Sequence, residues 1–335
     1  MPPFPKGQIR SDMEALFFGG KGMDEPLYLS CKEQLELFAA RGMEVKEHDI
    51  KKLEHINYYR LKEFARPLSK TRKENGVILV DYTGISFKEV LTRYYQDKNL
   101  RINLLHAIEK VEISLKTKIA QVLGESLGAY GYLNFSSWTN RAKFSRFEIE
   151  ERQYNFKKNL LKVMRHARSA DLTNRNKNKD GFPIIWLALD LLMFGDLIRM
   201  LEIMSNKNLK KIAACYSCEA NELISWMKCL HFVRNICAHN SNIIDLKLKT
   251  TPIQKSEWDN ILFMLKDKHG EKRQSNRLAI VLLIVYHLVS QINEHYKWKN
   301  LKNNIKTICA GKEKNANLLG FSSIEASKKV FKKEK

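Results

Sequence analysis

The sequence predicts an all-α fold, and three observations lead to this prediction. Apolar residues recur at the i, i+3, i+4 spacing of an amphipathic helix along most of the chain. Ser-x-x-Glu capping boxes begin two of these stretches, at Ser30 and Ser86. Only residues 77–80 resemble a β-strand, which we expect in a small hairpin or an extended connection. We therefore expect a helical bundle.

The expected helices are bounded by capping boxes, glycines and charged turns. They cover residues 30–41, 49–64, 86–95, 97–123, 140–165, 183–197, 231–242, 250–266 and 276–298. In the second of these, Ile56, Tyr59 and Phe64 are expected to face the core, and Tyr58 and Tyr59 are expected as core and rim residues rather than as a base-stacking platform. The longest apolar run, 278–289, is interrupted by His287 and is shorter than the roughly 18 to 20 residues that span a bilayer. We expect it as a buried helix.

The domain organisation follows from composition. A chain of 335 residues, 44% hydrophobic and 28% charged, is typical of a soluble globular protein with a substantial core. Residues 1–24 contain several prolines and glycines and are expected as a flexible N-terminal arm. Residues 25–325 are expected as one helical unit, interrupted by a basic loop at 166–182, and residues 326–335 as a basic tail.

The charge of the chain favours a polyanionic partner. Lys and Arg number 58 and Asp and Glu 37, which gives a formal net charge of +21 and a pI near 9.6. Nucleic acid fits this balance best. Cations of the predicted helix 140–165 and the following loop are the expected contacts to RNA phosphates. They are Arg165, Arg168, Arg175, Lys177 and Lys179.

The sequence also argues against several other classes of protein. The N-terminus has no apolar segment of a signal peptide, and the six cysteines lie mostly in apolar or helical contexts that suit reduced thiols in a cytoplasm. Cys215 and Cys218 form a C-x-x-C, but two further zinc ligands at a suitable spacing are missing. We expect no metal, no cofactor and no membrane association.

Polar residues of the predicted helix 231–242 are the candidates for chemistry. On a helical wheel His231, Arg234, Asn235, His239 and Asn242 fall within an arc of about 140°, opposite an apolar face. Arg234 and His239 would lie about 7.5 Å apart along the axis. Arginine can bind two phosphate oxygens, and histidine can transfer protons near neutral pH. The pair therefore predicts phosphate chemistry.

A second Arg-x4-His occurs at Arg101 and His106 in the predicted helix 97–123. The two side chains would point about 140° apart, with Arg101 toward the apolar stripe. We therefore do not expect a second catalytic pair. Arg101 and Glu112 share a face, and we expect them in a buried or half-buried ion pair that orients the catalytic helix.

Arg234-Asn-x-x-x-His239 resembles the signature of the HEPN superfamily, and the longer string from Arg234 to Ser241 resembles the Abi family, the AbiD/AbiF-like abortive infection proteins of bacteria. Further segments are similar to that family and extend the resemblance over residues 25–325. They are Asn-Tyr-Tyr-Arg-Leu at 57–61, Asp97 to Arg101 with Glu109 and Glu112, Pro-x-x-Trp at 183–186 with Asp190 and Phe194-Gly195, and Leu318 to Phe321.

This resemblance implies a HEPN-type helical bundle at about residues 86–300, with additional N-terminal and C-terminal helices. It implies a metal-independent endoribonuclease in which His239 transfers protons, Arg234 stabilises the phosphorane and Asn235 orients the imidazole, leaving a 2′,3′-cyclic phosphate. Asp190 occupies a position that is usually acidic in the family. Where Abi members often have an arginine three residues after the histidine, this chain has Asn242.

The resemblance further implies phage defence, a bound structured noncoding RNA, and a homodimer with its site across a two-fold axis. Segment 97–123 of the same chain is an alternative source of the second half of the site. Two other functions are compatible with the sequence. One is a noncatalytic RNA-binding component of a ribonucleoprotein with a degenerate HEPN site, and the other is a toxin that binds a host protein.

Overall fold

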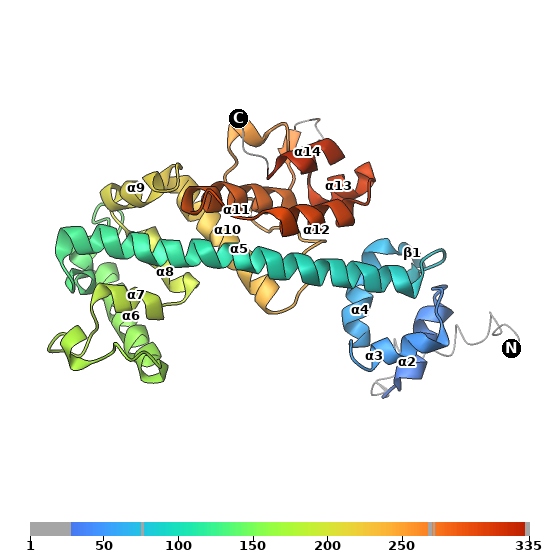
Figure 1. Ribbon diagram of the computed structural model, residues 1–335, viewed down its shortest axis with the longest axis horizontal. Coiled ribbons are helices and arrows are strands. Elements are labelled where there is room, and N and C mark those ends of the chain that lie inside the picture. Colours follow the sequence, from blue (N-terminus) through green and yellow to red (C-terminus); the bar gives the residue numbers. More distant parts are fainter. Residues whose placement is uncertain (1–27, 75–76, 267–269, 271, 332–335) are drawn as a thin grey trace, which may run out of the picture. The chain divides into compact units, whose positions relative to one another are not determined.

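The computed structural model describes residues 28–74, 77–266, 270 and 272–331, and it is mostly helical (Figure 1). The prediction of an all-α fold is confirmed. The chain packs as two compact units with a boundary after Asn99, rather than the single unit expected over residues 25–325. The expected arm, residues 1–24, lies outside the described residues.

Among its described residues, the first unit contains three helices, a hairpin and the start of a fourth helix. Its elements are α2 (Cys31–Ala40), α3 (Ile50–Leu53), α4 (Tyr58–Ala65), β1 (Lys70–Glu74), β2 (Val77–Asp81) and the first part of α5 (Phe87–Leu127), with 3-10 turns at Glu47–Asp49 and Arg66–Leu68. The antiparallel pair β1 and β2 confirms the strand predicted at 77–80.

The second unit contains the remainder of α5 and all later elements. These are α6 (Arg146–His166), α7 (Ile185–Leu191), α8 (Phe194–Ile203), α9 (Asn206–Ala214), α10 (Ala220–Ala238), β3 (Met264–Lys266), β4 (Lys272–Gln274), α11 (Leu278–Ile292), α12 (Lys299–Cys309), α13 (Glu313–Leu319) and α14 (Ile324–Lys329). Short 3-10 turns cover Gly131–Leu133, Phe135–Ser137, Asn174–Asn176 and Ser256–Trp258.

Local signals explain the first unit. In α2 the hydroxyl of Ser30 accepts from the amide of Glu33, whose carboxylate accepts from the amide of Ser30, as the capping box predicts. Phe38 of α2 packs in the core against Tyr58, with ring centroids 4.7 Å apart. Ile56 and Phe64 are buried as expected, but Tyr59 is 66% exposed, so its expected place in the core is wrong and Tyr58 faces the core instead.

The long helix α5 was expected as two helices separated near Asp97. It begins after the capping box of Ser86 and Glu89, and it runs without interruption because no glycine or proline occurs between Phe87 and Leu123. The predicted apolar stripe of its second part is fully buried at Leu104, Ile108 and Val111 among others.

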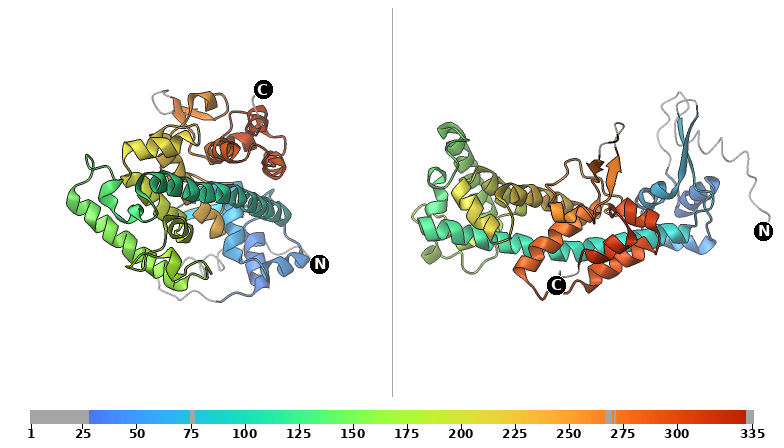
Figure 2. Two further views of the ribbon diagram at one scale, coloured as in Figure 1. Left: turned by 60° about the vertical axis from the view of Figure 1, so that its left-hand side comes forward. Right: turned by 90° about the horizontal axis from the view of Figure 1, so that it is seen from above.

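The core of the second unit is built around α5, α10 and α11. Every residue of α11 from Leu278 to Val285 is buried, so the prediction of a buried helix is confirmed. Helix α10 packs against α8, α9 and α11. Asn103 of α5 donates to Asn304 of α12 at 2.8 Å, so these two helices lie side by side (Figure 2). Among the described residues, no helix combines the length and apolar character needed to cross a bilayer.

Two predicted helices are wrong in detail. Residues 250–266 form a 3-10 turn and a strand rather than a helix, because Ile253 is held in an extended segment by bonds to Trp226 and Ser225 of α10. The helix expected over 183–197 is divided into α7 and α8. Asp196 causes this division because its carboxylate accepts from the amide of Met193 and begins a new helix there.

The basic tail expected at 326–335 is also corrected for its described part. Residues 324–329 form α14, and Val330 and Phe331 are buried. The ring of Phe331 stacks on Trp298, with centroids 5.0 Å apart. Apolar side chains in the last residues therefore tie this segment to the second unit, despite the surrounding lysines.

Candidate functional site

The end of α10 determines how His239 is presented. His239 is the C-cap of the helix and Asn240 follows in the left-handed conformation, with φ of 59°. The amide of Asn240 donates to the carbonyl of Cys237 and that of Ser241 to the carbonyl of Ile236, which is the Schellman arrangement. The predicted helix therefore stops at Ala238, and Asn242 lies outside it.

A buried arginine from α5 holds this helix end. Arg101 is 4% exposed, and its Nη1 donates to Oδ1 of Asn240 at 2.8 Å. Asparagine tolerates the left-handed conformation better than most residues, and here its side chain also gives a buried cation an acceptor. The contact joins α5 to the turn that carries His239. Arg101 thus acts on the candidate site through Asn240.

Arg234 lies in the last turns of α10 and His239 is its C-cap, with wheel directions about 140° apart. Five residues of helix separate them, which corresponds to about 7.5 Å along the axis. Arg234 is half-buried and His239 is exposed. The imidazole of His239 makes no side-chain hydrogen bond within the described part of the chain. It is therefore accessible to a ligand.

Asn235 does not lie where the sequence placed it. It was expected to orient His239, but its Nδ2 lies 3.3 Å from Nε2 of His231 on the preceding turn. Nη1 of Arg234 donates to its Oδ1 at 3.4 Å. When Nδ2 donates, Nε2 of His231 must be the accepting, unprotonated nitrogen. The amide therefore links a neutral imidazole to the guanidinium of Arg234.

His231 occupies a tight position between α10 and α8. A Cβ at Gly195 would lie 3.2 Å from its Nε2, so glycine makes room for the ring, as the predicted close approach of helices at Gly195 implies. The ring of Phe194 meets the imidazole edge-on, with centroids 5.9 Å apart. Burial, and then the charges of Arg234 and Arg199, lower the pKa of His231. These effects favour the neutral imidazole.

The N-terminus of α8 extends this polar network to α6. One carboxylate oxygen of Asp196 accepts from Nδ2 of Asn159 in α6 at 3.1 Å and also pairs with Arg199. The other oxygen caps α8 through the amide of Met193. Asp196 is buried, so this set of bonds fixes α6 and α8 beside the polar face of α10.

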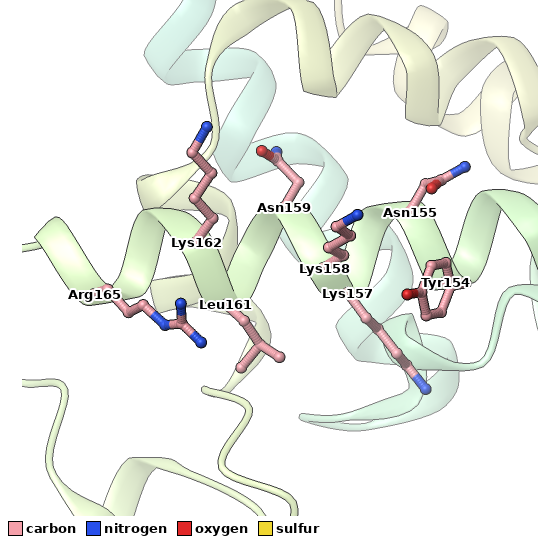
Figure 3. Close-up of a pocket in the computed structure, with 8 residues that line it drawn as sticks. All are labelled: Tyr154, Asn155, Lys157, Lys158, Asn159, Leu161, Lys162 and Arg165. Carbon is pink, nitrogen blue, oxygen red and sulfur yellow. The ribbon is translucent and has the colours of Figure 1, made fainter.

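Helix α6 carries a cationic surface next to this network (Figure 3). From Gln153 to Ala170 the sequence has no Asp or Glu. On a helical wheel Tyr154, Lys158, Lys162 and Arg165 fall within an arc of about 80°. They line a hollow of about 580 Å³ with their neighbours on the helix. The three cations make no ion pair within the described part of the chain.

The other predicted RNA contacts lie in the loop that follows α6. Arg168, Arg175 and Lys179 are exposed, and Lys177 is half-buried beside its bridge to Pro183. The loop is ordered around the 3-10 turn Asn174–Asn176. With Arg165 at the end of α6, it extends the cationic surface along the chain.

The remaining predicted site residues have other surroundings. Glu112 lies 4.0 Å from Lys116, and the expected ion pair with Arg101 is wrong because eleven residues of continuous helix separate the two by about 16 Å. Asp190 is exposed, with Lys116 donating to its carbonyl oxygen rather than to its carboxylate. Ser241 contributes its backbone amide to the helix stop.

His106 also differs in its surroundings from Arg101, as expected. Its Nδ1 lies 2.8 Å from the hydroxyl of Tyr296, so the two residues of the second Arg-x4-His have separate partners. Cys215 and Cys218 lie after α9, where their sulfurs donate to the carbonyls of Lys211 and Ala213. In the described part of the chain, all six cysteines are free.

Sequence reasoning missed three contributors to the network. Asp196, Arg199 and Asn159 come from helices far apart in the chain, and none belongs to the Arg-x4-His signature. Asp196 had one usable signal. An acidic residue at the third position of a helix can accept from the amide of the residue that precedes the helix, and the spacing from Met193 to Asp196 fits this pattern. The contacts of Arg199 and Asn159 had no signal of their own in the sequence.

Comparison with known proteins gives one match. A family model described as Abi-like protein matches residues 51–245, more than half of the chain. The matched region includes the helix stop, the polar face of α10 and the cationic surface of α6. Curated proteins and solved structures gave no match.

The Arg101 contact leads to a first prediction. Asn240→Gly keeps a residue that accepts the left-handed conformation but removes the acceptor of a buried cation. We expect the free energy of unfolding to fall by about 1.5 to 3 kcal/mol, the net contribution of a hydrogen bond to a charged group. Ala310 is the matched control because it also has a positive φ, of 48°. Ala310→Gly should instead stabilise by up to about 1 kcal/mol. Urea unfolding of both variants tests this difference in sign.

His231 leads to a second prediction. Its pKa is lowered in the folded state, so the unfolded chain binds the proton more readily. The contribution of neutral His231 to the free energy of unfolding is complete above the pKa of an unfolded histidine, about 6.5. It is lost as the pH falls from there toward the lower pKa of the folded state. His231→Gln keeps an acceptor and cannot titrate. We expect the loss of stability between pH 7 and 5, measured by urea unfolding, to be smaller than in wild type.

The matched control for this experiment is His55→Gln, at an exposed position of the first unit. It should leave the pH dependence unchanged. Burial also lowers the pKa of His287, so protonation of this residue likewise destabilises the fold as the pH falls. Part of the pH dependence therefore remains in every variant. An identical pH dependence in wild type and His231→Gln would contradict the prediction.

Proposed function

The chain belongs to the Abi-like protein family, and we propose that it is a metal-independent endoribonuclease with the HEPN arrangement of Arg234 and His239. The family points to abortive infection, the defence in which an infected bacterium is arrested before phage spread. One observation supports the nuclease proposal above others. An exposed His239 ends α10 five residues after Arg234, and α6 of the same unit carries an acid-free cationic surface.

The proposed reaction uses the nucleophile that RNA itself carries. The 2′-hydroxyl attacks the adjacent phosphorus while a neutral imidazole of His239 takes its proton. The bond to the 5′-oxygen then breaks, and this oxygen takes up a proton as it leaves. The products are a 2′,3′-cyclic phosphate and a 5′-hydroxyl end. DNA lacks the nucleophile and would not be cleaved.

Arg234 supplies the charge that this reaction needs. Its guanidinium stays protonated and can bind two non-bridging oxygens as negative charge grows on the phosphorane. Asn235 accepts from that guanidinium, and neutral His231 on the preceding turn holds the amide of Asn235. In this proposal His231 and Asn235 act through Arg234. Asn235 therefore has a positioning role different from the one its sequence position suggested.

Proton transfer to the leaving group needs a second donor. We propose that His239 of the partner subunit supplies it in a homodimer, where a two-fold axis brings two α10 ends together. The alternative source within one chain, segment 97–123, is disfavoured because Arg101 is buried against Asn240 and His106 is bonded to Tyr296. The two side chains are thus held on different faces of α5.

RNA is the proposed substrate and also a proposed stable partner. Lys158, Lys162 and Arg165 would follow the phosphates of a single strand, and the exposed ring of Tyr154 offers a surface on which a base can stack. The loop cations Arg168, Arg175, Lys177 and Lys179 would continue this contact. A structured noncoding RNA bound there would block or guide access to Arg234.

The second candidate function is a noncatalytic RNA-binding protein. One observation favours it, because the imidazole of His239 is not oriented by a side chain of the described residues, as a general base often is. Under this alternative the α6 surface and Arg234 bind phosphate, and no cyclic phosphate forms. The experiment below separates the two functions.

The nuclease proposal leads to a third prediction. His239→Ala should abolish RNA cleavage and toxicity in cells while leaving the unfolding midpoint unchanged, because the side chain is exposed. Arg234→Lys should lower the cleavage rate by about 10²- to 10³-fold, because a single ammonium cannot bind two oxygens. Gel assays of a labelled RNA, with detection of the cyclic phosphate, give the measurement. His55→Ala is the control, and cleavage retained by His239→Ala would refute the proposal.

The cationic surface leads to a fourth prediction. Replacing Lys158, Lys162 and Arg165 together by Ala should weaken RNA binding equally for different sequences. The slope of log Kd against log salt concentration should fall by about 2, since each phosphate contact to a single strand contributes about 0.7. Fluorescence anisotropy across a salt series measures this slope.

The matched control removes the same charge from another helix. Lys207, Lys210 and Lys211 are exposed on α9, and their replacement by Ala should leave the slope unchanged. Equal effects of the two triple variants would mean that net charge alone, rather than the α6 surface, governs binding.

A further inference from the structure

A second pocket, lined mainly by polar residues, lies in the second unit, on the face of α5 that points away from Arg101. Its volume is about 350 Å³, within the range of small-ligand sites. Asn103, His106 and Lys110 line it from α5, and they fall within an arc of about 60°. Arg101, which supports the α10 end, projects about 170° from the middle of this arc. The pocket is therefore separate from the candidate nuclease site.

The opposite wall comes from the segment between α11 and α12. His295, Tyr296 and Lys297 line the pocket together with Asn293 of the same segment and Asn300 of α12, and Leu301 is the single apolar residue of the lining. Nδ1 of His106 lies 2.8 Å from the hydroxyl of Tyr296, which joins the two walls. Lys110 approaches the same ring at 6.0 Å.

Aromatic packing builds this wall in advance. The ring of Tyr296 packs on Trp298, with centroids 4.5 Å apart, and Trp298 stacks on buried Phe331. Asn293 fixes the start of the segment because its Oδ1 accepts from the amide of His295 at 3.0 Å. The pocket thus has a rigid base, which lowers the entropic cost of binding a ligand.

The charges of the pocket select an anion. Its lining contains two lysines, two histidines and no carboxylate. Glu294 is the carboxylate next to it in the chain, and it lies 3.3 Å from Nε2 of His295. Lys110 and Lys297 make no ion pair within the described part of the chain. They remain available to a phosphate.

We propose that this pocket binds a nucleoside monophosphate, either as a free nucleotide or as the phosphorylated end of an RNA strand. Lys110, Lys297 and His106 hold the phosphate, while the asparagine amides and the ring of His295 meet the sugar and base. The volume exceeds that needed by a bare phosphate. The site is independent of cleavage by Arg234 and His239, so either proposal can fail without the other.

Calorimetric titration of the full chain with 5′-AMP, adenosine and inorganic phosphate tests the proposal. We expect 5′-AMP to bind more tightly than either fragment. Lys110→Ala with Lys297→Ala, and separately His106→Ala, should weaken 5′-AMP by about tenfold or more, the effect of losing a charge-assisted hydrogen bond. Lys207→Ala with Lys210→Ala on α9 removes the same charge elsewhere and should change nothing.

A second arm distinguishes the two sources of the nucleotide. A ten-nucleotide RNA with a 5′-phosphate is compared with the same RNA bearing a 5′-hydroxyl, using His239→Ala protein so that the strand stays intact. A preference for the phosphorylated strand that disappears in the Lys110 and Lys297 variant supports an RNA end, and 5′-AMP binding without this preference supports a free nucleotide. Phosphate binding as tightly as 5′-AMP, or equal binding by pocket and control variants in both arms, would overturn the proposal.

Discussion

The hydrogen bond from Arg101 to Asn240 is the contact on which the geometry of the candidate site depends. It joins residues 139 positions apart in the sequence and fixes where α10 ends. A helix continued by one more turn would carry His239 and its successors along the α10 surface. The left-handed residue stops it instead and leaves His239 at an open terminus. Because the guanidinium is buried, any change of this turn would leave a desolvated cation without one of its acceptors.

The second constraint is the close approach of α8 to α10. Glycine at 195 admits the ring of His231, and the ring then accepts from Asn235, whose carbonyl oxygen faces Arg234. Each step depends on the preceding one. A side chain at Gly195 would displace the imidazole of His231 and release the amide of Asn235. Gly195 therefore influences the orientation of Arg234, although it has no side chain of its own. Asp196 strengthens this arrangement by fixing α8 to α6 through Asn159.

Much of the fold could be predicted from local patterns. The capping boxes at Ser30 and Ser86 mark real helix starts, and the apolar run of α11 is buried, because both signals act over a few residues. Errors arose where distant contacts decide the conformation. Residues 250–266 were expected as a helix, but Trp226 and Ser225 of α10 hold Ile253 in an extended segment. Periodicity contains no information about such bonds.

The candidate site shows the same division. The wheel placed Arg234 and His239 within one arc of about 140°, a relation that helical geometry alone determines. It placed Asn235 on the same side but could not identify its partner. His231 and His239 both lie on turns next to Asn235, and the choice of His231 follows from the packing of α8. The pairing of Arg101 with Glu112 failed for a simpler reason, since sharing a helix face does not bring residues eleven positions apart into contact.

Proton transfer is the remaining argument for two copies in the proposed reaction. His231 and His239 are eight residues apart, about 12 Å along the helix axis, and Nε2 of His231 is already engaged by Asn235. Both proton transfers occur at oxygens of one phosphorus, within hydrogen-bond reach of their catalysts. One α10 therefore supplies an imidazole for only one of them. A two-fold axis near the helix end would bring a second His239 to the other oxygen. Such a dimer requires that the end of α10 is uncovered in a single chain, and the exposed side chain of His239 meets this requirement.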